Sequence, residues 1–269
     1  MSEPLSVCIA GATGWTGPAL AHGVLEAPDL WLRSAVSRSA AGRDLGEALG
    51  GDALGVPVFG SVTEALDGID VLVDYTSATA VKANVMAAIA AEVGVVIGSS
   101  GLTADDFAEI DAAARERSVG VVASGNFSLT AAMCQAGALL AARHLPRWEV
   151  IDYASATKPD VPSGTARELA ERLGEIRRPE LGHPIEDLHG PQEARGATVA
   201  GTQIHSLRLP SFVVSTEVVF GLPDERLTIR HDAGGTPEPY VAGTLIAVRR
   251  VPALVGLTRG LDTLLLQSG

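Results

Sequence analysis

The feature that most constrains the fold is the alternation of short apolar runs with helical patterns through the first half of the chain. Five apolar runs, at 5–11, 31–37, 71–77, 93–101 and 120–126, predict strands, and amphipathic segments stand between most of them. Alternation of this kind is typical of a parallel sheet with helices on both faces. The first half is therefore predicted to be an α/β domain.

After about residue 127 the pattern changes. A long helical segment, 131–145, is followed by segments in which apolar and polar residues alternate; they span 149–155, 202–209, 212–221 and 226–232. A period of two predicts strands with one covered face, in an antiparallel or mixed sheet. The sequence thus predicts a second domain of α+β type with a mixed sheet.

Two further segments complete the predicted organisation. Residues 174–201 are rich in glycine, proline and charge and are predicted to form a loop, whereas 238–251 returns to a helical pattern. We expect this tail to pack back on the first domain. The predicted boundaries are 1–126 plus the tail 236–269 for the first domain, and 127–235 for the second.

The charge balance narrows the range of partners. The net charge is −12, which disfavours nucleic acid or an anionic membrane as the main partner.

The N-terminal residues lack the pattern of a signal peptide, and no apolar run is long enough to span a membrane. Cys8 and Cys134 lie in apolar surroundings and are predicted to be buried thiols, so we expect a cytoplasmic protein.

A glycine-rich turn directly follows the first predicted strand. Gly11, Gly14 and Gly17 are spaced to allow a tight turn and a close backbone approach to a pyrophosphate at a helix start. The alternative is a tight packing turn without a ligand. Trp15 and Thr16 lie inside the turn, and Trp15 could either cover the pyrophosphate or pack on the surface. The sequence predicts a dinucleotide site.

The end of the second predicted strand bears on the choice of cofactor. An acidic residue there would bind the ribose 2′-hydroxyl, whereas an arginine accepts a 2′-phosphate. Here the strand ends in Ser37, Arg38 and Ser39, without a carboxylate. We predict NADPH, with a solvated surface arginine as the alternative for Arg38.

A second candidate site lies in "KPDVPSGTA", residues 158–166. Thr165 and Glu168 match a capping box, which predicts that a helix starts at Thr165, with Ser163 and Gly164 at or just before that start. Helix N-termini favour anions, and Lys158 adds a positive charge. The segment predicts a seat for a carboxylate or phosphate; the alternative is a capped helix beside a solvated lysine.

The histidines offer no obvious acid–base centre. His205 and His231 lie within predicted strands and are expected to be structural, while His183 and His189 are expected to be solvated loop residues. No cluster has the spacing of metal ligands, and no nucleophile motif is present, so no metal is predicted.

Taken together, these motifs resemble the dihydrodipicolinate reductase family of lysine biosynthesis. The similar segments are "GATGWTG" (11–17), "DYTS" (74–77), "IGSSGLT" (97–103), "GNFSL" (125–129) and "KPDVPSGTA" (158–166). The resemblance covers essentially the whole chain. It implies an N-terminal Rossmann domain, a C-terminal substrate domain that assembles a homotetramer, and hydride transfer from NADPH or NADH to a cyclic dicarboxylate.

The resemblance also implies site residues. The residues implied for the dinucleotide are Gly11, Gly14, Trp15, Thr16, Gly17, Arg38, Thr76, Gly98, Ser100, Asn126 and Phe127. Those implied for a substrate carboxylate are Ser100, Ser155, Lys158, Ser163, Gly164 and Thr165, with Lys158 also the candidate catalytic residue.

The chain departs from the family pattern at the acid–base centre. The family carries a His-His pair three to four residues before the lysine, and here those positions are Ala154 and Ser155. Gly125 replaces a proline, and Pro237 stands where an arginine is frequent. The sequence therefore favours a reductase that transfers a hydride to a C=N or a conjugated C=C of a different small carboxylate, such as a cyclic imine or imino acid whose nitrogen is already protonated. The alternatives are a genuine 4-hydroxy-tetrahydrodipicolinate reductase and a non-catalytic nucleotide-binding paralogue.

Overall fold

The computed structural model describes residues 3–266, which form two compact units. The first unit runs to residue 129 and resumes at 237, and the second spans 130–236. Each unit is described by itself.

The first unit is built on a seven-stranded sheet in which every pairing is parallel. Its strands are β1 (Leu5–Ala10), β2 (Leu30–Val36), β3 (Val58–Phe59), β4 (Val71–Asp74), β5 (Gly94–Ile97), β6 (Gly120–Ala123) and β12 (Gly256–Arg259). Their order is β12-β6-β5-β4-β1-β2-β3. β4, β5 and β6 are buried along their whole length because helices cover both faces of the sheet.

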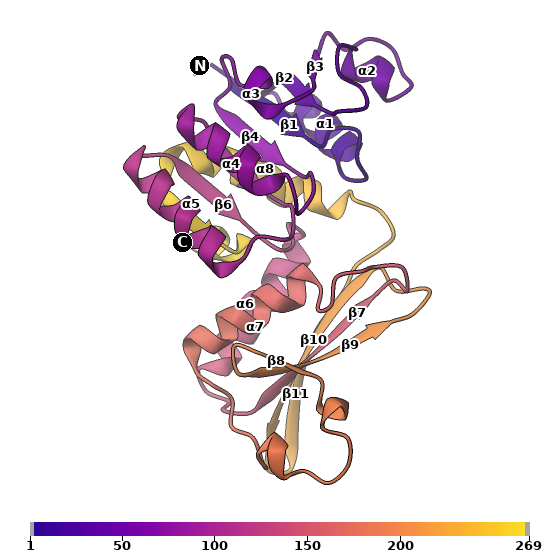
Figure 1. The fold of residues 1–269 in the computed structure, drawn as a ribbon, viewed down its shortest axis with the longest axis vertical. Helices are drawn as coiled ribbons and strands as arrows, with labels where there is room; N and C mark the ends of the chain where they lie inside the picture. Colours follow the sequence, from indigo (N-terminus) through magenta and orange to yellow (C-terminus); the bar gives the residue numbers. More distant parts are fainter. Residues whose placement is uncertain (1–2, 267–269) are drawn as a thin grey trace. The chain divides into compact units, whose positions relative to one another are not determined.

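Helices follow the strands as the alternating pattern predicts. They are α1 (Gly17–Glu26), α2 (Leu45–Ala48), α3 (Val62–Ala65), α4 (Val81–Ala90), α5 (Ala104–Glu116), α8 (Pro239–Arg250) and α9 (Leu261–Leu266), with a 3₁₀ turn at Val251–Ala253. In Figure 1, α4 and α5 cover one face of the sheet while α8 lies behind it. α1 packs against α8, so the tail helix belongs to the layer that α1 begins.

The second unit is a five-stranded mixed sheet with helices on one face. The strands are β7 (Trp148–Ala154), β8 (Ala197–Val199), β9 (Thr202–Arg208), β10 (Val214–Leu222) and β11 (Glu225–Asp232), in the order β11-β10-β7-β9-β8. β7 and β9 are parallel, and the other pairs are antiparallel. α6 (Leu129–Ala142) and α7 (Gly164–Ile176) bury their apolar sides against Trp148, Val150 and Phe220.

The predicted fold class is confirmed, with two local differences. The segment 174–201 is not only loop: it contains the end of α7, 3₁₀ turns at Ile185–Asp187 and Gln192–Arg195, and the edge strand β8. The tail contributes not only a helix but also β12, which pairs with β6, and α9. The sequence did not predict β3, β8 or β12. These strands are only two to four residues long, too short to show a period, and pairing with β2, β9 and β6 respectively defines them.

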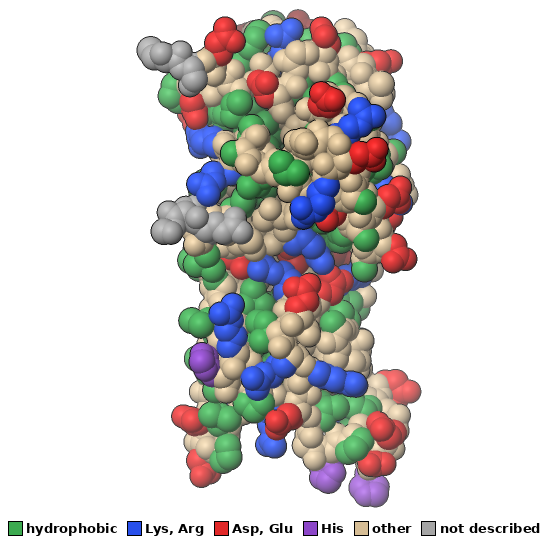
Figure 2. Space-filling model, turned by 90° about the vertical axis from the view of Figure 1, so that its left-hand side faces the viewer, with side chains coloured by type: hydrophobic (Ala, Val, Ile, Leu, Met, Phe, Trp, Pro, Cys, Tyr) green, Lys and Arg blue, Asp and Glu red, His purple; other side chains and the backbone are tan. Residues whose placement is uncertain are grey.

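Within residues 3–266, no helix is both long and apolar enough to cross a bilayer. Figure 2 shows acidic and basic side chains interspersed over the face it presents. The excess negative charge therefore forms no single acidic patch on that face.

Candidate functional site

The first candidate site lies where the strand order of the first unit reverses. β1 has β2 on one side and β4 on the other, and ligands of open α/β sheets bind in the crevice at such a switch point. The chain leaves β1 through Gly11, whose φ is +84°. A Cβ on Gly11 would lie 2.2 Å from the carbonyl oxygen of Tyr75, the residue after β4. Only glycine permits this close approach of the two loops.

A cavity of about 780 Å³ opens at this edge of the sheet. Four of the predicted cofactor residues line it: Gly11, Gly14, Arg38 and Thr76. The lining also includes Ser37 and Ser39, which flank Arg38 in the sequence. Further lining residues carry no predicted role: Thr13, Gly60, Ser61, Tyr75, Ser77 and Asn84. The cavity is thus formed by the loops after β1, β2, β3 and β4.

Hydroxyl groups line the part of the cavity near Arg38. Thr13 Oγ1 lies 2.7 Å from Ser37 Oγ, which lies 3.2 Å from Ser39 Oγ. Among the described residues, the lining contains no carboxylate. An exposed arginine beside several hydroxyls suits a phosphate, and the glycine turn suits a pyrophosphate, so the residues present fit a dinucleotide.

A buried carboxylate organises the loops that border the cavity. Asp74, at the end of β4, is fully buried, and its Oδ1 accepts hydrogen bonds from the backbone N–H of Thr76 (3.1 Å) and from the hydroxyls of Thr76 (2.8 Å) and Ser99 (2.6 Å). Asn84 of α4 donates to Oδ2 over 2.8 Å. Asp74 therefore fixes Thr76 and Ser99 to each other. In the sequence, the polar residue closing an otherwise apolar strand was the available sign of this role.

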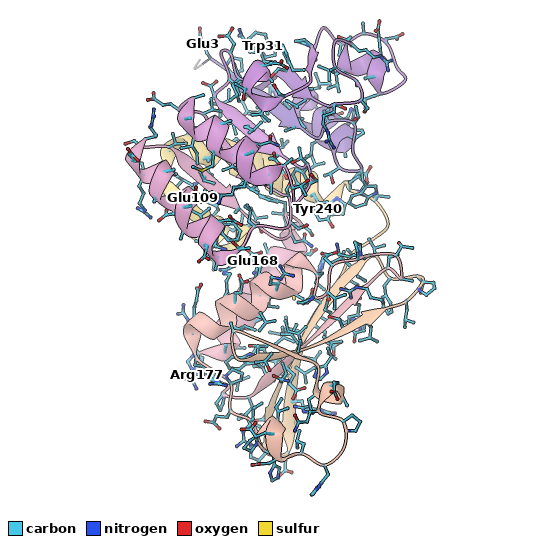
Figure 3. All side chains as sticks on the ribbon, viewed as in Figure 1. Glu3, Trp31, Glu109, Glu168, Arg177 and Tyr240 are labelled. Atoms are coloured by element: carbon cyan, nitrogen blue, oxygen red, sulfur yellow. The ribbon has the colours of Figure 1, made fainter. Side chains whose placement is uncertain are left out.

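The remaining predicted cofactor residues divide into three groups. Thr16 and Gly17 are buried at the start of α1, and Trp15 beside them is 55% exposed. Tyr240, labelled in Figure 3, lies at the start of α8. The Trp15 ring packs edge-on against it, with ring centroids 5.9 Å apart. Trp15 thus packs partly on the surface; whether it also covers a pyrophosphate stays a prediction.

Gly98 and Ser100 follow β5. A Cβ on Gly98 would fall within 2.1 Å of the Tyr75 ring, so glycine is needed for this ring to pack. Ser100 is exposed. Asn126 and Phe127 follow β6 and are buried, Phe127 with its ring centroid 6.2 Å from that of Tyr75. The Phe127 side chain therefore supports the loop from inside the first unit.

The second candidate site lies at the start of α7 in the second unit. The helix begins at Gly164, and Ser163 is its N-cap, with Ser163 Oγ accepting from the backbone N–H of Ala166. The predicted start at Thr165 is therefore wrong by one residue. Ser163 has extended dihedral angles and a short side chain that reaches the amide three residues on, which serine does well. The backbone N–H groups of Gly164 and Thr165 belong to the first turn, where the helix dipole favours an anion.

Lys158 stands before this helix start and pairs with Asp160, with 2.9 Å between Nζ and Oδ1. Ser155 is partly exposed, and its Oγ lies 3.1 Å from Thr157 Oγ1. Ala154 is fully buried. Of the two positions where the family pattern has histidines, one is thus enclosed in the core and the other lies at the surface.

The neighbouring polar groups are occupied or face elsewhere. Tyr153 lies on the opposite face of β7 from Ala154, as strand alternation predicts, and its hydroxyl donates to Glu217 over 3.1 Å. The His205 ring and the Arg195 guanidinium both contact Glu149. His183, with His205, borders a separate cavity of about 640 Å³ in the second unit.

Two further histidines and the two cysteines offer no alternative acid–base centre within the described part of the chain. Burial lowers the pKa of His231. His189 is an exposed loop residue. Both cysteines are buried free thiols, and burial raises the pKa of Cys8 to about 12 and that of Cys134 to about 11. No group of three or more potential metal ligands occurs within residues 3–266.

The reversed strand order, the glycine turn at the switch point and the fitting cavity define a dinucleotide-binding enzyme of the Rossmann type with a second, mixed-sheet domain. Family comparison then makes the assignment specific. Residues 5–127 match the model "Dihydrodipicolinate reductase, N-terminus", and residues 125–264 match "Dihydrodipicolinate reductase, C-terminus". The chain belongs to the dihydrodipicolinate reductase family and is an NAD(P)H-dependent oxidoreductase.

Individual relatives agree over the full length. A 4-hydroxy-tetrahydrodipicolinate reductase of Thermosynechococcus vestitus is 37% identical, with 98% of each chain covered. A protein of the same name from Desulfitobacterium hafniense is 36% identical over 98% of this chain and 99% of its own. Among solved structures, a dipicolinate-bound dihydrodipicolinate reductase from Paenisporosarcina sp. TG-14 aligns with a TM-score of 0.76 and 29% identity, over 97% of this chain and 99% of that one.

Proposed function

We propose that this protein is an NADPH-dependent 4-hydroxy-tetrahydrodipicolinate reductase. The observation that carries the proposal is the 37% identity to a reductase of that name, which extends over 98% of both chains. The comparisons support this substrate better than the changed substrate that the sequence alone favoured. The coarser conclusion, a reductase of this family, does not depend on the choice between them.

In this proposal, the loops after β1, β2 and β4 hold the cofactor. Gly11, Gly14 and Gly17 would present backbone N–H groups to the pyrophosphate, and Arg38 with the hydroxyls of Ser37 and Ser39 would bind the 2′-phosphate. The bound cofactor supplies a hydride. The preference for NADPH over NADH is supported by the arginine and by the lining without a carboxylate.

The start of α7 would hold a carboxylate of the substrate. Lys158 would contribute its positive charge, Ser163 its place as N-cap, and Gly164 and Thr165 their first-turn amides. Ser100 and Ser155 are the further polar contacts implied by the resemblance. Binding through the carboxylate fixes the orientation of the reacting carbon, which is the main contribution a protein makes to hydride transfer.

Reduction of a C=N or a conjugated C=C adds a hydride and a proton, and the origin of the proton distinguishes this chain. Ala154 has no proton to give, and Ser155 is a poor acid compared with an imidazole. Asp152 lies on the same strand but is fully buried. We propose that Lys158, or water at the partly exposed Ser155, supplies the proton in place of a histidine.

A second candidate function is reduction of another cyclic imine or imino acid with a carboxylate. The observation that favours it is the presence of Ala154 and Ser155 where the family carries its histidine pair. A substrate whose nitrogen is already protonated would need no acid at these positions. The carboxylate seat and the cofactor loops would serve it equally well.

The organisation implied by the family resemblance remains part of the proposal. We propose a homotetramer assembled through the second domain, with functional boundaries at 1–126 plus 236–269 and 127–235. Sedimentation or light scattering of the purified protein would test the assembly.

The decisive experiment follows absorbance of the reduced nicotinamide with NADPH and NADH. Freshly generated 4-hydroxy-tetrahydrodipicolinate is offered in parallel with a panel of cyclic imines and imino acids, and Lys158→Ala serves as the site control. Oxidation with the first substrate at an ordinary enzymatic rate supports the leading proposal. Oxidation of NADPH only with other imines supports the second candidate function. If no compound of the panel causes oxidation although NADPH still binds, the result would point to a non-catalytic nucleotide-binding protein.

A further inference from the structure

A charged pair lies buried beneath the start of α7. Arg208, the last residue of β9, places Nη2 2.8 Å from Oδ2 of Asp152 on the neighbouring strand β7. Asp152 is fully buried, and the Arg208 side chain is only 15% exposed. Ser206 Oγ donates to the same carboxylate oxygen over 3.0 Å. The Asp152 carboxylate is shielded from water and the Arg208 side chain is largely so, so each charge depends on the other.

The same two side chains hold both ends of the segment that leads into α7. Arg208 Nη2 donates to the carbonyl oxygen of Asp160 over 2.6 Å. Asp152 Oδ2 accepts from the backbone N–H of Ser163, the N-cap residue, over 2.9 Å. Residues 160–163 are therefore tied to the sheet at their first and last positions. This anchoring fixes where the first turn of α7 points.

The contacts extend to Lys158. Asp160, held at its carbonyl by Arg208, pairs through its side chain with Lys158 Nζ over 2.9 Å. The positive and negative groups alternate from Asp152 through Arg208 and Asp160 to Lys158. A carboxylate arriving at Lys158 would compete with Asp160, whose backbone stays fixed because Arg208 holds it.

We propose that Arg208 and Asp152 are positioning residues that pre-organise the carboxylate seat formed by Lys158, Ser163, Gly164 and Thr165. The proposal rests on the proposed function, since it concerns the same seat. A seat that is ordered before binding loses less entropy when the ligand arrives. Neither residue needs to touch the ligand, and both act through the backbone of residues 160–163.

The test uses Arg208→Gln and Arg208→Lys, with Arg226→Gln as the matched control, because Arg226 is an exposed arginine on β11 of the same sheet. The probe is dipicolinate, measured by calorimetry in the presence of NADPH. We expect Arg208→Gln to weaken dipicolinate binding at least about tenfold, because it leaves Asp152 unpaired and frees residues 160–163. NADPH affinity should stay unchanged, and Arg208→Lys should recover part of the loss.

Hydrogen exchange of the ligand-free protein provides a readout that does not depend on the substrate. Arg208→Gln should speed exchange across residues 158–166 while residues 167–176 of α7 keep their protection. The double variant Asp152→Asn with Arg208→Gln removes the unpaired charge. It should regain melting temperature but not dipicolinate affinity, because the ties to Asp160 and Ser163 are still lost or weakened.

Three results would overturn the proposal. One is that residues 158–166 of the Arg208→Gln variant exchange their amide hydrogens at the wild-type rate. Another is wild-type dipicolinate affinity in that variant. The third is recovery of affinity together with melting temperature in the double variant, which would show a purely structural pair. If the wild-type protein binds no dipicolinate, the proposed function fails, whereas the exchange result still decides whether Arg208 orders the seat.

Discussion

Ser99 donates its hydroxyl hydrogen to Oδ1 of Asp74 over 2.6 Å, at the edge of the sheet where β4 and β5 end. The backbone N–H of Thr76 in turn donates to Ser99 Oγ over 2.7 Å. Two loops that are distant in sequence are thus joined by one buried carboxylate. Thr76 lines the dinucleotide cavity, so the geometry of this part of the cavity depends on Asp74.

Asp74→Asn should therefore affect both stability and cofactor binding. An amide presents one acceptor oxygen instead of two and adds a donor among groups that already donate. We expect a loss of about 2 kcal/mol in the free energy of unfolding, typical of hydrogen bonds to a charged group, and weaker NADPH binding. Urea denaturation and NADPH titration measure the two effects. Asp52→Asn, at an exposed loop position, should change neither.

Arg38 should decide between the two cofactors. It is exposed at the edge of the cavity beside Ser37 and Ser39, where a 2′-phosphate would add a charged partner. Arg38→Ala should raise the KM for NADPH roughly 10- to 100-fold, because one or two charge-assisted hydrogen bonds to the 2′-phosphate are lost. The KM for NADH should stay near its wild-type value. Equal effects on both cofactors would show that Arg38 does not contact the 2′-phosphate.

The prediction of the fold from the sequence worked best where the local pattern was strong. Buried parallel strands such as β4 and β5 consist almost wholly of apolar residues. The helical pattern that follows each strand in the sequence marks where that strand ends. β12 escaped prediction because Gly256–Arg259 gains its strand character only from pairing with β6. The start of α7 was misplaced because Thr165 and Glu168 mimic a capping box, while Ser163 was the better cap.

The candidate sites show the same limit. Motif spacing pointed to Gly11, Arg38 and Lys158, because backbone turns and charges leave local traces in the sequence. The supporting groups could not be found in this way. Asp152 and Arg208 are 56 residues apart and meet only because β7 and β9 are neighbours in the folded sheet. Asp74 and Ser99 likewise depend on the pairing of β4 with β5.

Acid should loosen the attachment of β12 to α5. Asp111 of α5 accepts from Arg115 Nε over 2.9 Å and from the backbone N–H of Leu257 over 2.7 Å. The Arg115 side chain, followed by the Leu257 amide, holds the pKa of Asp111 below its ordinary value of 3.8. Because the folded pKa is the lower one, this stabilisation is complete above the ordinary value and is lost as the pH falls through the folded pKa.

Denaturation midpoints measured from about pH 5 to about pH 2 test this attachment. Asp111→Asn should lower the midpoint at pH 5 and weaken its dependence on pH below that. Asp105→Asn, an exposed position of the same helix, is the control. An unchanged acid slope in Asp111→Asn would show that the contact with Leu257 adds no pH-dependent stability.

The last prediction concerns the missing histidines. Ala154 is fully buried, so a histidine there would overpack the core, whereas Ser155 is partly exposed and has room for an imidazole. If proton transfer limits the reaction, Ser155→His should raise kcat at least about tenfold near neutral pH, since a positioned general acid contributes 10²-fold or more. The increase should vanish as the pH rises through the imidazole pKa. Ala156→His, one residue further along and exposed, should have no such effect.

Substitution of Lys158 then separates charge from proton donation. Arg keeps the positive charge that a carboxylate needs but does not release a proton, whereas Met removes both. If Lys158 only binds, Lys158→Arg should retain most of kcat and Lys158→Met should raise KM. If Lys158 also donates the proton, both variants should lose kcat, and adding Ser155→His to Lys158→Arg should restore it. Retention of kcat by Lys158→Arg, together with no gain from Ser155→His, would leave water as the proton source.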